Sequence, residues 1–421
     1  MDVEWYGLRL KPAKLSEVDS GGIDDHDHHQ PAWRGPLLYS AWDACFMVLA
    51  IASVVVDVVS DCYVAYVHAD NGLMLAMWLT IALIVVPGWI STCASLLMIT
   101  QDRHEHRYHH HHHGKNRWSC RWLVLFHVLP LVLVPRYVSS LQFALKSQQE
   151  SRPRAERQMY YYQMLWEDYD ASYLRLIEAF LEAAPQMLLQ AVLVLTVYGY
   201  GSDDDIGDEP AYFWPHLVVP MFLSLFSLAY AVVCYKRSLR ISQNAKRLSL
   251  TATVTLLCSQ LALIASRLVV LALFLAVTPV EVAVTAVVAR LLFNVAWLAL
   301  FLDFRHVTST AEAVTLRVIL AFVYLFTYLD FSDGQTGRRQ LIHHVATVVD
   351  CGVLLALYAL YTTHLNVYCV VAAICLYPLG LMLLVFYYCK CHPTSMSDGV
   401  HFIEPPVETA APPPPPPQRH S

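Results

Sequence analysis

Acidic side chains stand inside the first long apolar run of this sequence, where a charge is costly to bury. The run covers residues 41–68 and holds Asp43, Asp57 and Asp61. Fourteen residues return a helix to within about 40° of its starting direction, and eighteen return it to that direction, so the three carboxylates share one stripe. The stripe is about 27 Å long, close to the thickness of a membrane's hydrocarbon core. Three acids on one stripe predict either a bank of cationic partners or a polar path across the membrane.

A later apolar run, residues 173–198, begins with three charges on one helix face. Arg175, Glu178 and Glu182 have the spacing i, i+3 and i+7, which places them on neighbouring turns. We expect opposite charges on adjacent helices to pair, because an unpaired buried charge is the costlier state. The pairs alone would fix helix register, but their spread over several depths and segments favours a functional polar route. The other ionisable residues in apolar runs are Arg267, Arg290 and Asp350.

The runs that carry these charges are long enough to cross a membrane. Of the 421 residues, 57% are hydrophobic and 15% are charged, whereas a soluble domain has roughly a quarter charged residues. A run of about 20 residues spans the hydrocarbon core, so the composition predicts an all-α polytopic membrane protein. We distinguish ten runs, at residues 41–68, 73–100, 122–144, 173–198, 212–234, 250–277, 282–304, 313–329, 341–363 and 366–389.

Two of the ten runs differ from the others. Residues 122–144 contain Pro130, Pro135 and Arg136, and residues 313–329 are short. We expect each to enter the bilayer and return on the same side, which requires protein or water to cover the broken backbone. With this layout and a cytosolic N-terminus, the outside connections contain no Lys or Arg, as the positive-inside rule requires. The sequence therefore predicts eight transmembrane helices plus two half-inserted re-entrant helices, with both termini cytosolic.

The order of hairpin, half-helix and hairpin occurs twice along the chain, which predicts two structural repeats. We expect a disordered cytosolic N-terminal tail and a disordered, proline-rich cytosolic C-terminal tail outside them. The predicted units are residues 1–38 (N-terminal tail), 39–234 (first repeat), 235–249 (basic cytosolic linker), 250–389 (second repeat) and 390–421 (C-terminal tail).

Several classes of function have no support in the sequence. No GxxxxGK[ST] loop, GxGxxG turn or HExxH pair occurs, so the motifs of ATPases, dehydrogenases and zinc proteases are absent. No nucleophile constellation is visible, so we expect no enzyme activity and no cofactor. The histidine-rich stretch 109–113 lacks a carboxylate or cysteine framework, so we predict no metal site there. A net charge of -6 argues against a nucleic-acid partner.

The intramembrane charges alone fit more than one function. A narrow path would carry ions or a small solute, and a groove open sideways to lipid would carry phospholipid headgroups while the tails stay in the bilayer. In a third interpretation the charges are structural and the tails recruit partner proteins. Composition does not choose among a scramblase, a transporter or channel, and a scaffold.

One stretch carries a specific family resemblance. The segment YLRLIEAFLEAAPQMLLQ, residues 173–190, resembles the signature of the XK-related membrane proteins. Further stretches match in order: DACFMVLAIASVVVDVVSDCY (43–63), CYKRSLRISQNAK (234–246), SRLVVLALF (266–274), FSDGQTGRRQ (331–340) and VATVVDCGVLL (345–355). The last has Asp350 where relatives usually carry Glu. The resemblance covers roughly residues 40–390, and the tails match nothing.

The resemblance implies a phospholipid scramblase of the plasma membrane that exposes phosphatidylserine, in some relatives after a caspase cuts a tail. It implies membrane phospholipids as substrate, and a caspase and a single-pass chaperone subunit as partners. Arg290 and the histidine-rich loop depart from the family pattern. The residues that match charges lining or bracing the lipid path are Asp43, Asp57, Asp61, Arg175, Glu178, Glu182, Arg267 and Asp350.

Two aspartates in the tails are candidate caspase sites, since a caspase needs Asp followed by a small residue in an exposed segment. Asp19 ends Ser-Glu-Val-Asp before Ser20, and Asp398 ends Ser-Met-Ser-Asp before Gly399. Asp333 also ends a DxxD pattern, but it lies in a loop that matches a structural motif of the family. Asp19 is the better candidate.

Overall fold

The structure is a computed structural model, and it is helical over almost all of the chain that it describes. A short antiparallel hairpin, β1 (Glu4–Tyr6) and β2 (Arg9–Lys11), lies within the predicted N-terminal tail. The remainder of that tail and the whole of residues 392–421 lie outside the described residues. The described residues are 4–6, 9–11, 39–108, 132–198, 210–244, 248–301, 310–329 and 336–391.

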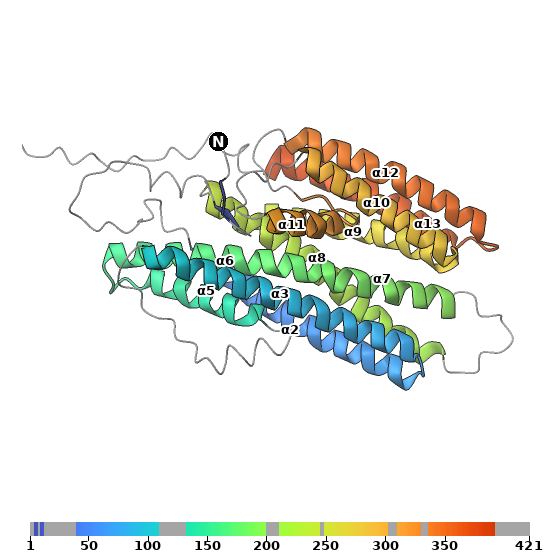
Figure 1. The fold of residues 1–421 in the computed structure, drawn as a ribbon, viewed down its shortest axis with the longest axis horizontal. Coiled ribbons are helices and arrows are strands. Elements are labelled where there is room, and N and C mark those ends of the chain that lie inside the picture. The colour runs from blue at the N-terminus through green and yellow to red at the C-terminus, as the bar shows by residue number, and fades with distance from the viewer. Residues whose placement is uncertain are drawn as a thin grey trace, which may run out of the picture.

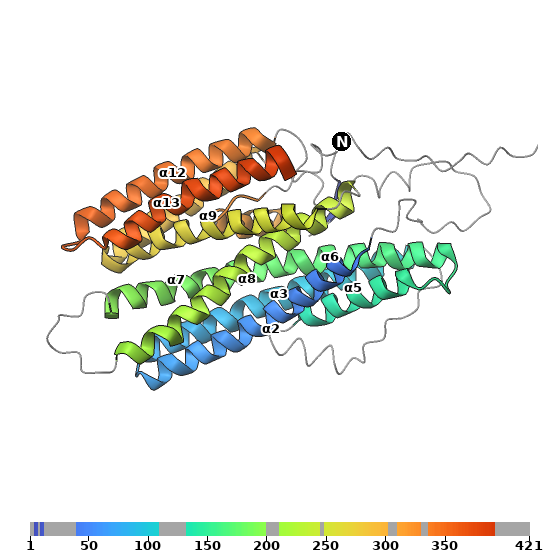
Figure 2. The same cartoon turned by 180° about the vertical axis from the view of Figure 1, so that it is seen from behind.

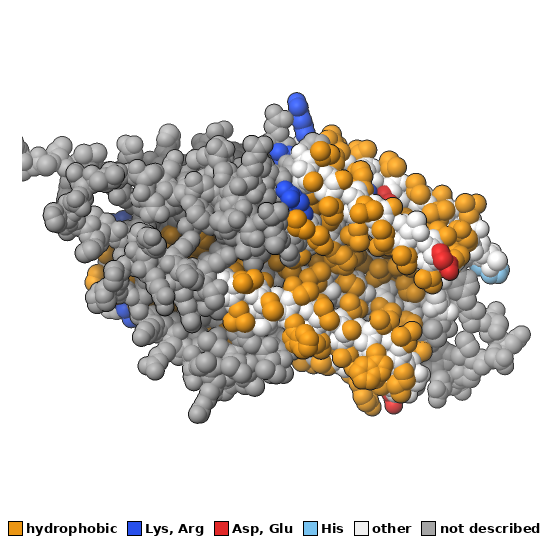
Figure 3. Space-filling view, in the orientation of Figure 1, with side chains coloured by type: hydrophobic (Ala, Val, Ile, Leu, Met, Phe, Trp, Pro, Cys, Tyr) orange, Lys and Arg blue, Asp and Glu red, His pale blue; other side chains and the backbone are white. Residues whose placement is uncertain are grey.

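Among the described residues, eight helices are long and apolar enough to cross a membrane, which supports a multi-pass membrane protein and agrees with the predicted number of spans. Large hydrophobic side chains cover much of the face shown in Figure 3, as expected where lipid replaces water as the solvent. The spans are Ala41–Asp70, Met74–Met98, Arg154–Thr196, His216–Ile241, Leu250–Val277, Val280–Leu300, Gly337–Tyr361 and Val367–Cys391.

The helices form two bundles that lie side by side in both ribbon views (Figures 1 and 2). Helix α9 joins them through contacts with α7 and α8, and α11 contacts α6. The first bundle contains α2 (Ala41–Asp70), α3 (Met74–Tyr108), α5 (Leu133–Gln148), α6 (Arg154–Leu181), α7 (Ala183–Leu193), the π-helical segment η1 (Val194–Tyr198) and α8 (Pro210–Asn244). The second contains α9 (Leu250–Val277), α10 (Val280–Phe301), α11 (Thr310–Val323), α12 (Thr336–Tyr361), α13 (Val367–Phe386) and the π-helical segment η2 (Tyr387–Cys391).

The two short helices, α5 and α11, fall in the runs that the sequence marks as half-inserted. Each follows a pair of long helices and precedes another such pair. This recurrence agrees with the predicted order of elements. Re-entry of the short helices into a bilayer, and the relation of the two halves as repeats, stay predictions.

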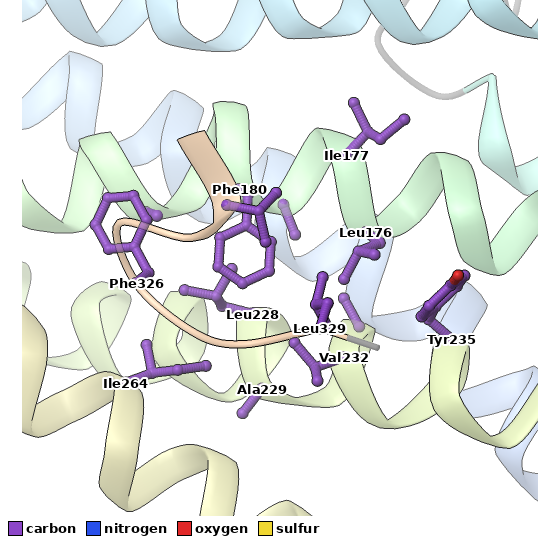
Figure 4. Close-up of a cluster of buried hydrophobic side chains, with 14 of the residues drawn as sticks. Leu176, Ile177, Phe180, Leu228, Ala229, Val232, Tyr235, Ile264, Phe326 and Leu329 are labelled. Atoms are coloured by element: carbon purple, nitrogen blue, oxygen red, sulfur yellow. The ribbon is translucent and has the colours of Figure 1, made fainter. Parts of the chain in front are cut away.

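The chain after α11 leaves the helical path and is buried inside the protein. Phe326 and Leu329 lie among side chains of α6, α8 and α9 (Figure 4). The irregular backbone there receives hydrogen bonds from side chains: Nε of Arg267 donates to the Leu325 carbonyl at 2.9 Å, and the Tyr324 hydroxyl donates to the Leu329 carbonyl at 2.8 Å. Protein covers this broken backbone, as a segment at membrane depth requires.

The fourth predicted run proves to be longer and is interrupted. Helix α6 begins at Arg154 rather than at residue 173, because residues 154–172 form a helix that packs on α5. The helix is broken at Glu182, and α7 starts at Ala183. Pro185 has no N–H with which to bond the carbonyl four residues earlier, which explains a break at this point. Together α6, α7 and part of η1 count as one span.

Helix α8 continues past the predicted end of its run at residue 234. It ends at Asn244, so most of the basic linker predicted at 235–249 is helical. Lys236 and Arg237 are buried on this extension. Hydropathy cannot predict this extension of α8, because each charged residue lowers the mean hydropathy of the segment. A partner elsewhere in the chain compensates the burial of the charge.

Candidate functional site

The deepest ion pair joins α2 to α6. An Nη of Arg175 lies 2.9 Å from Oδ2 of Asp57, and each side chain is 3% exposed. Ser227 of α8 donates its hydroxyl to the same carboxylate oxygen at 2.9 Å and also contacts Arg175. Three helices therefore meet at one buried carboxylate, and the expected pairing of opposite charges is confirmed here.

A second ion pair lies at the start of α2. Asp43 accepts hydrogen bonds from the backbone N–H and the hydroxyl of Ser40, at 2.8 and 2.9 Å, and so caps the helix. Its other oxygen lies 2.7 Å from an Nη of Arg237 on α8. The guanidinium of Arg237 also lies over the ring of Phe46, 4.7 Å from its centroid. Sequence reasoning treated Arg237 only as a loop charge, since its partner is 194 residues away.

Three other predicted acids of the first bundle, Asp61, Glu178 and Glu182, have carboxylate oxygens that are buried without such a partner in the described part of the chain. Both carboxylate oxygens of Asp61 are buried without a hydrogen-bond partner among the described residues, and so are Oε2 of Glu178 and Oε1 of Glu182. Glu182 lies close enough to Glu178, Asp61 and Asp57 for their charges to interact. Of the acids predicted to share a route, Asp57, Asp61, Glu178 and Glu182 lie together, between α2 and the α6–α7 helix.

Two glutamines extend this polar line along α7. Gln186 and Gln190 are fully buried, and none of their side-chain amide atoms has a hydrogen-bond partner among the described residues. They follow Glu178 and Glu182 at intervals of four residues, so each side chain neighbours the next one along the helix. We call the set the buried polar column; its members are Asp57, Asp61, Arg175, Glu178, Glu182, Gln186 and Gln190.

The column has more negative than positive groups. Its one arginine faces the carboxyl groups of Asp57, Asp61, Glu178 and Glu182. The Arg175–Asp57 pair stabilises the packing of the helices. Helix packing does not explain why further acids are buried without partners, because the burial of each such acid costs free energy. Such groups can bind protons, cations or the positive end of a zwitterionic molecule. The column is therefore the strongest candidate site in the described part of the chain.

Arg267 and Asp350 belong to the second bundle. Arg267 of α9 pairs with Asp350 of α12 and, as described above, also holds the segment after α11. Its Nη1 lies 3.2 Å from Sγ of Cys351. The two predicted site residues thus form an ion pair, but in a place apart from the column, where they brace the irregular segment. Arg290 lies nearby, half-buried, 3.4 Å from the hydroxyl of Thr347.

One further buried arginine was not predicted as a site residue. Arg136 of α5 lies 3.1 Å from Asp170 of α6 and donates to the hydroxyl and the carbonyl of Ser95 on α3, at 3.0 and 3.1 Å. An arginine within an apolar run is a signal that would have found it. The candidate caspase sites Asp19 and Asp398 lie outside the described residues.

Comparison with known proteins identifies the family. A family model described as "XK-related protein" matches residues 45–393. The chain belongs to the XK-related family. The resemblance carried by residues 173–190 is thereby confirmed, and the match includes both bundles and the whole buried polar column.

Two similar family members are nematode proteins named Cell death abnormality protein 8. The one from Caenorhabditis briggsae is 24% identical over 253 residues, which cover 57% of this chain and 53% of the relative. The one from Caenorhabditis elegans is 23% identical over 250 residues, with the same coverage of each chain. The chain spans about half the length of these relatives.

Proposed function

We propose that this XK-related chain is a phospholipid scramblase that moves lipids between the leaflets of the plasma membrane and exposes phosphatidylserine. The observation that carries the proposal is the buried polar column, in which acids without partners lie beside the Arg175–Asp57 pair. The names of the nematode relatives refer to cell death, and they support a role in the removal of dying cells. No covalent step, cofactor or energy source is part of the proposal, and the chain is not an enzyme.

The proposed mechanism lowers the cost of moving a charged headgroup through hydrocarbon. A charge at the bilayer centre costs about 2.5–3.5 kcal/mol or more. In the column, the carboxylates of Asp61 and Glu182 would accept the ammonium group of a headgroup, and Arg175 would accept its phosphate. At Arg175 the phosphate replaces the contact with Asp57 by another of the same type, while Asp61 and Glu182 gain a partner for oxygens that have none among the described residues. The acyl tails stay in lipid during the passage.

The orientation and partners of the protein are part of the same proposal. Basic residues such as Arg338, Arg339 and Lys390 lie at helix ends assigned to the inside, and the positive-inside rule then puts both termini in the cytosol. A caspase that cuts a tail, and a single-pass chaperone subunit, are the proposed protein partners. Phospholipid is the proposed substrate, and nucleic acid is not a partner.

A cation path is the second candidate, and the excess of carboxylates in the column favours it specifically. It would use Asp61, Glu178 and Glu182 as ligands for a small cation. Both functions need the same acids, so transport of lipid and transport of ions must be measured on the same preparation.

The test uses the full chain in liposomes that contain fluorescent phosphatidylserine or phosphatidylcholine. A membrane-impermeant quencher added outside the liposomes reaches lipid of the inner leaflet only if the protein moves that lipid to the outer leaflet. The measurement is made before and after caspase treatment. Glu182→Gln and Asp61→Asn should slow transfer about tenfold or more, since each removes a charge worth more than the 1.4 kcal/mol that a factor of ten requires. Glu281→Gln, at an exposed position on α10, is the matched control and should leave the rate unchanged.

Ion flux is recorded in parallel with a trapped potassium-sensitive dye. Flux of ions that depends on Glu182, without transfer of either lipid, would replace the scramblase proposal by the cation path. Equal lipid transfer by the wild-type protein, Asp61→Asn and Glu182→Gln would remove the column from the mechanism.

A further inference from the structure

A membrane-facing groove between α12 and α13 lies apart from the buried polar column. Both helices pack on α9 and make few contacts with each other, which leaves a space of 420 Å³ between them. Figure 2 shows the two helices side by side on the outer side of the second bundle. Side chains that line the groove include Gln340, His344, Val345, Val348, Leu384 and Tyr388.

The length of the groove matches one leaflet of a membrane. Its lining on α12 runs from Gly337 to Val349, which is about 18 Å of helix. Half of the hydrocarbon core is roughly 15 Å thick. The groove is therefore long enough for the acyl chain of a lipid in one leaflet and too short to cross the membrane.

The surface of the groove is almost entirely apolar, as the binding site of an acyl chain would be. Gln340 and His344 lie toward the end where α12 begins, and the deeper part is lined by valine and leucine. Nδ1 of His344 lies 3.0 Å from the hydroxyl of Tyr377, and its Nε2 has no hydrogen-bond partner among the described residues. The acyl tail of a lipid would meet this apolar lining.

Near the end of the groove where α12 begins, the charged residues that the structure describes are basic. Arg338 is exposed, and at about 100° per residue its direction falls between those of the lining residues Val345 and Val349. Arg339 points about 100° away from it. Lys390 adds a positive charge from η2. No acidic residue occurs in α12 before Asp350, nor in α13 or η2.

We propose that this groove binds an anionic phospholipid of the cytosolic leaflet, with its acyl chain between α12 and α13 and its phosphate at Arg338. Basic pockets between transmembrane helices on the cytosolic side are known to recognise anionic headgroups. The assignment to the cytosolic leaflet rests on the orientation given under the proposed function. The lipid bound here is a resident ligand, held away from the path of transported lipid.

The test uses the full chain in nanodiscs with phosphatidylserine or phosphatidylcholine that carries a photoactivatable group in its acyl chain. After illumination, mass spectrometry should find phosphatidylserine attached to peptides covering 340–349 and 381–388, in preference to phosphatidylcholine. Arg338→Gln should lower that preference about fivefold, the factor expected from one basic residue near an anionic headgroup. Arg339→Gln, on another face of the same helix, is the matched control and should keep the preference.

A second variant tests the apolar part of the groove. Val348→Trp fills the apolar part and should reduce labelling by both lipids. Equal labelling of the wild-type protein by the two lipids would overturn the proposal, as would equal effects of Arg338→Gln and Arg339→Gln. Hydroxylamine cleaves thioesters. If it releases an acyl chain from the groove, that chain was attached to the exposed Cys389 of η2, and this result would also overturn the proposal. This experiment measures lipid binding and not lipid transport. Its result can therefore be interpreted even if the scramblase proposal fails.

Discussion

The acidic residues of the first bundle include some that stabilise the fold through ion pairs and others that are buried without a partner in the described part of the chain. Asp43 caps α2 and pairs with Arg237, and Asp57 receives Arg175 and Ser227. Asp61, in contrast, is fully buried and has no hydrogen-bond partner among the described residues. Neutralising a paired acid and neutralising Asp61 should therefore have opposite consequences for stability.

Asp57→Ala should destabilise the protein by about 3–5 kcal/mol, because it leaves the buried guanidinium of Arg175 without its partner. Asp61→Asn removes no hydrogen bond and relieves a buried charge, so we expect its stability to equal or exceed that of the wild type. Thermal unfolding of the purified variants in one detergent measures both effects. The double variant Asp57→Ala/Arg175→Met should recover part of the loss. A loss of the same size in Asp61→Asn would contradict the division between the two acids.

At the scale of elements, α9 and α13 pack closely over an extended contact in the second bundle. Ser259 donates its hydroxyl to the Gly380 carbonyl at 2.9 Å, and Ser266 donates to the Ala373 carbonyl at 2.7 Å. Small residues let helix backbones approach in this way within membranes. A Cβ atom at Gly380 would lie 2.7 Å from Cγ of Leu263, so the contact has no room for a side chain.

Gly380→Val should therefore cost about 1–3 kcal/mol, the usual effect of overpacking a well-packed interface. The matched control is Gly352→Val on α12, since a Cβ atom there meets nothing within 4 Å. The fraction of monodisperse protein that survives heating, read by size-exclusion chromatography, compares the two. If both variants lose stability equally, helix propensity rather than the α9–α13 contact is responsible.

For the molecule as a whole, the arrangement of two bundles separates the proposed transport path from the rest of the fold. The buried polar column lies within the first bundle, while Arg267 and Asp350 brace the second. The column is enclosed by side chains in this structure. A scramblase of this design needs a signal that opens the path, and cleavage of a tail is the signal that we propose.

Annexin binding tests that signal in cells that lack their own scramblases and express this chain. Surface phosphatidylserine should appear after caspase activation, and Asp19→Ala should abolish it if the N-terminal tail holds the switch. Asp398→Ala serves as the comparison at the other tail. Exposure before caspase activation would keep the scramblase and discard the switch. No exposure in either state, with the protein at the cell surface, would favour the transporter or scaffold.

The tertiary structure corrects the sequence-based description mainly at charged helix ends. The sixth run, residues 250–277, coincides with α9, since its hydropathy and the N-cap of Ser249 agree on where the helix begins. The starts and ends of α6 and α8 were missed, because residues 154–172 and 235–244 are helical by virtue of packing and ion pairs. The roles of the site residues in lipid passage stay predictions.

The sequence by itself determined the class of the protein, its eight spans, its family, and the expectation that intramembrane charges would pair. Those properties follow from the length of apolar runs, from local motifs, and from the cost of burying a lone charge. Only the tertiary structure decided which acids are paired. Arg175 meets Asp57 across 118 residues of chain, and Arg267 meets Asp350 across 83, while Asp61 and Glu182 form no ion pair within the described part of the chain. Partner choice depends on which helix faces meet, and a linear sequence does not contain that geometry.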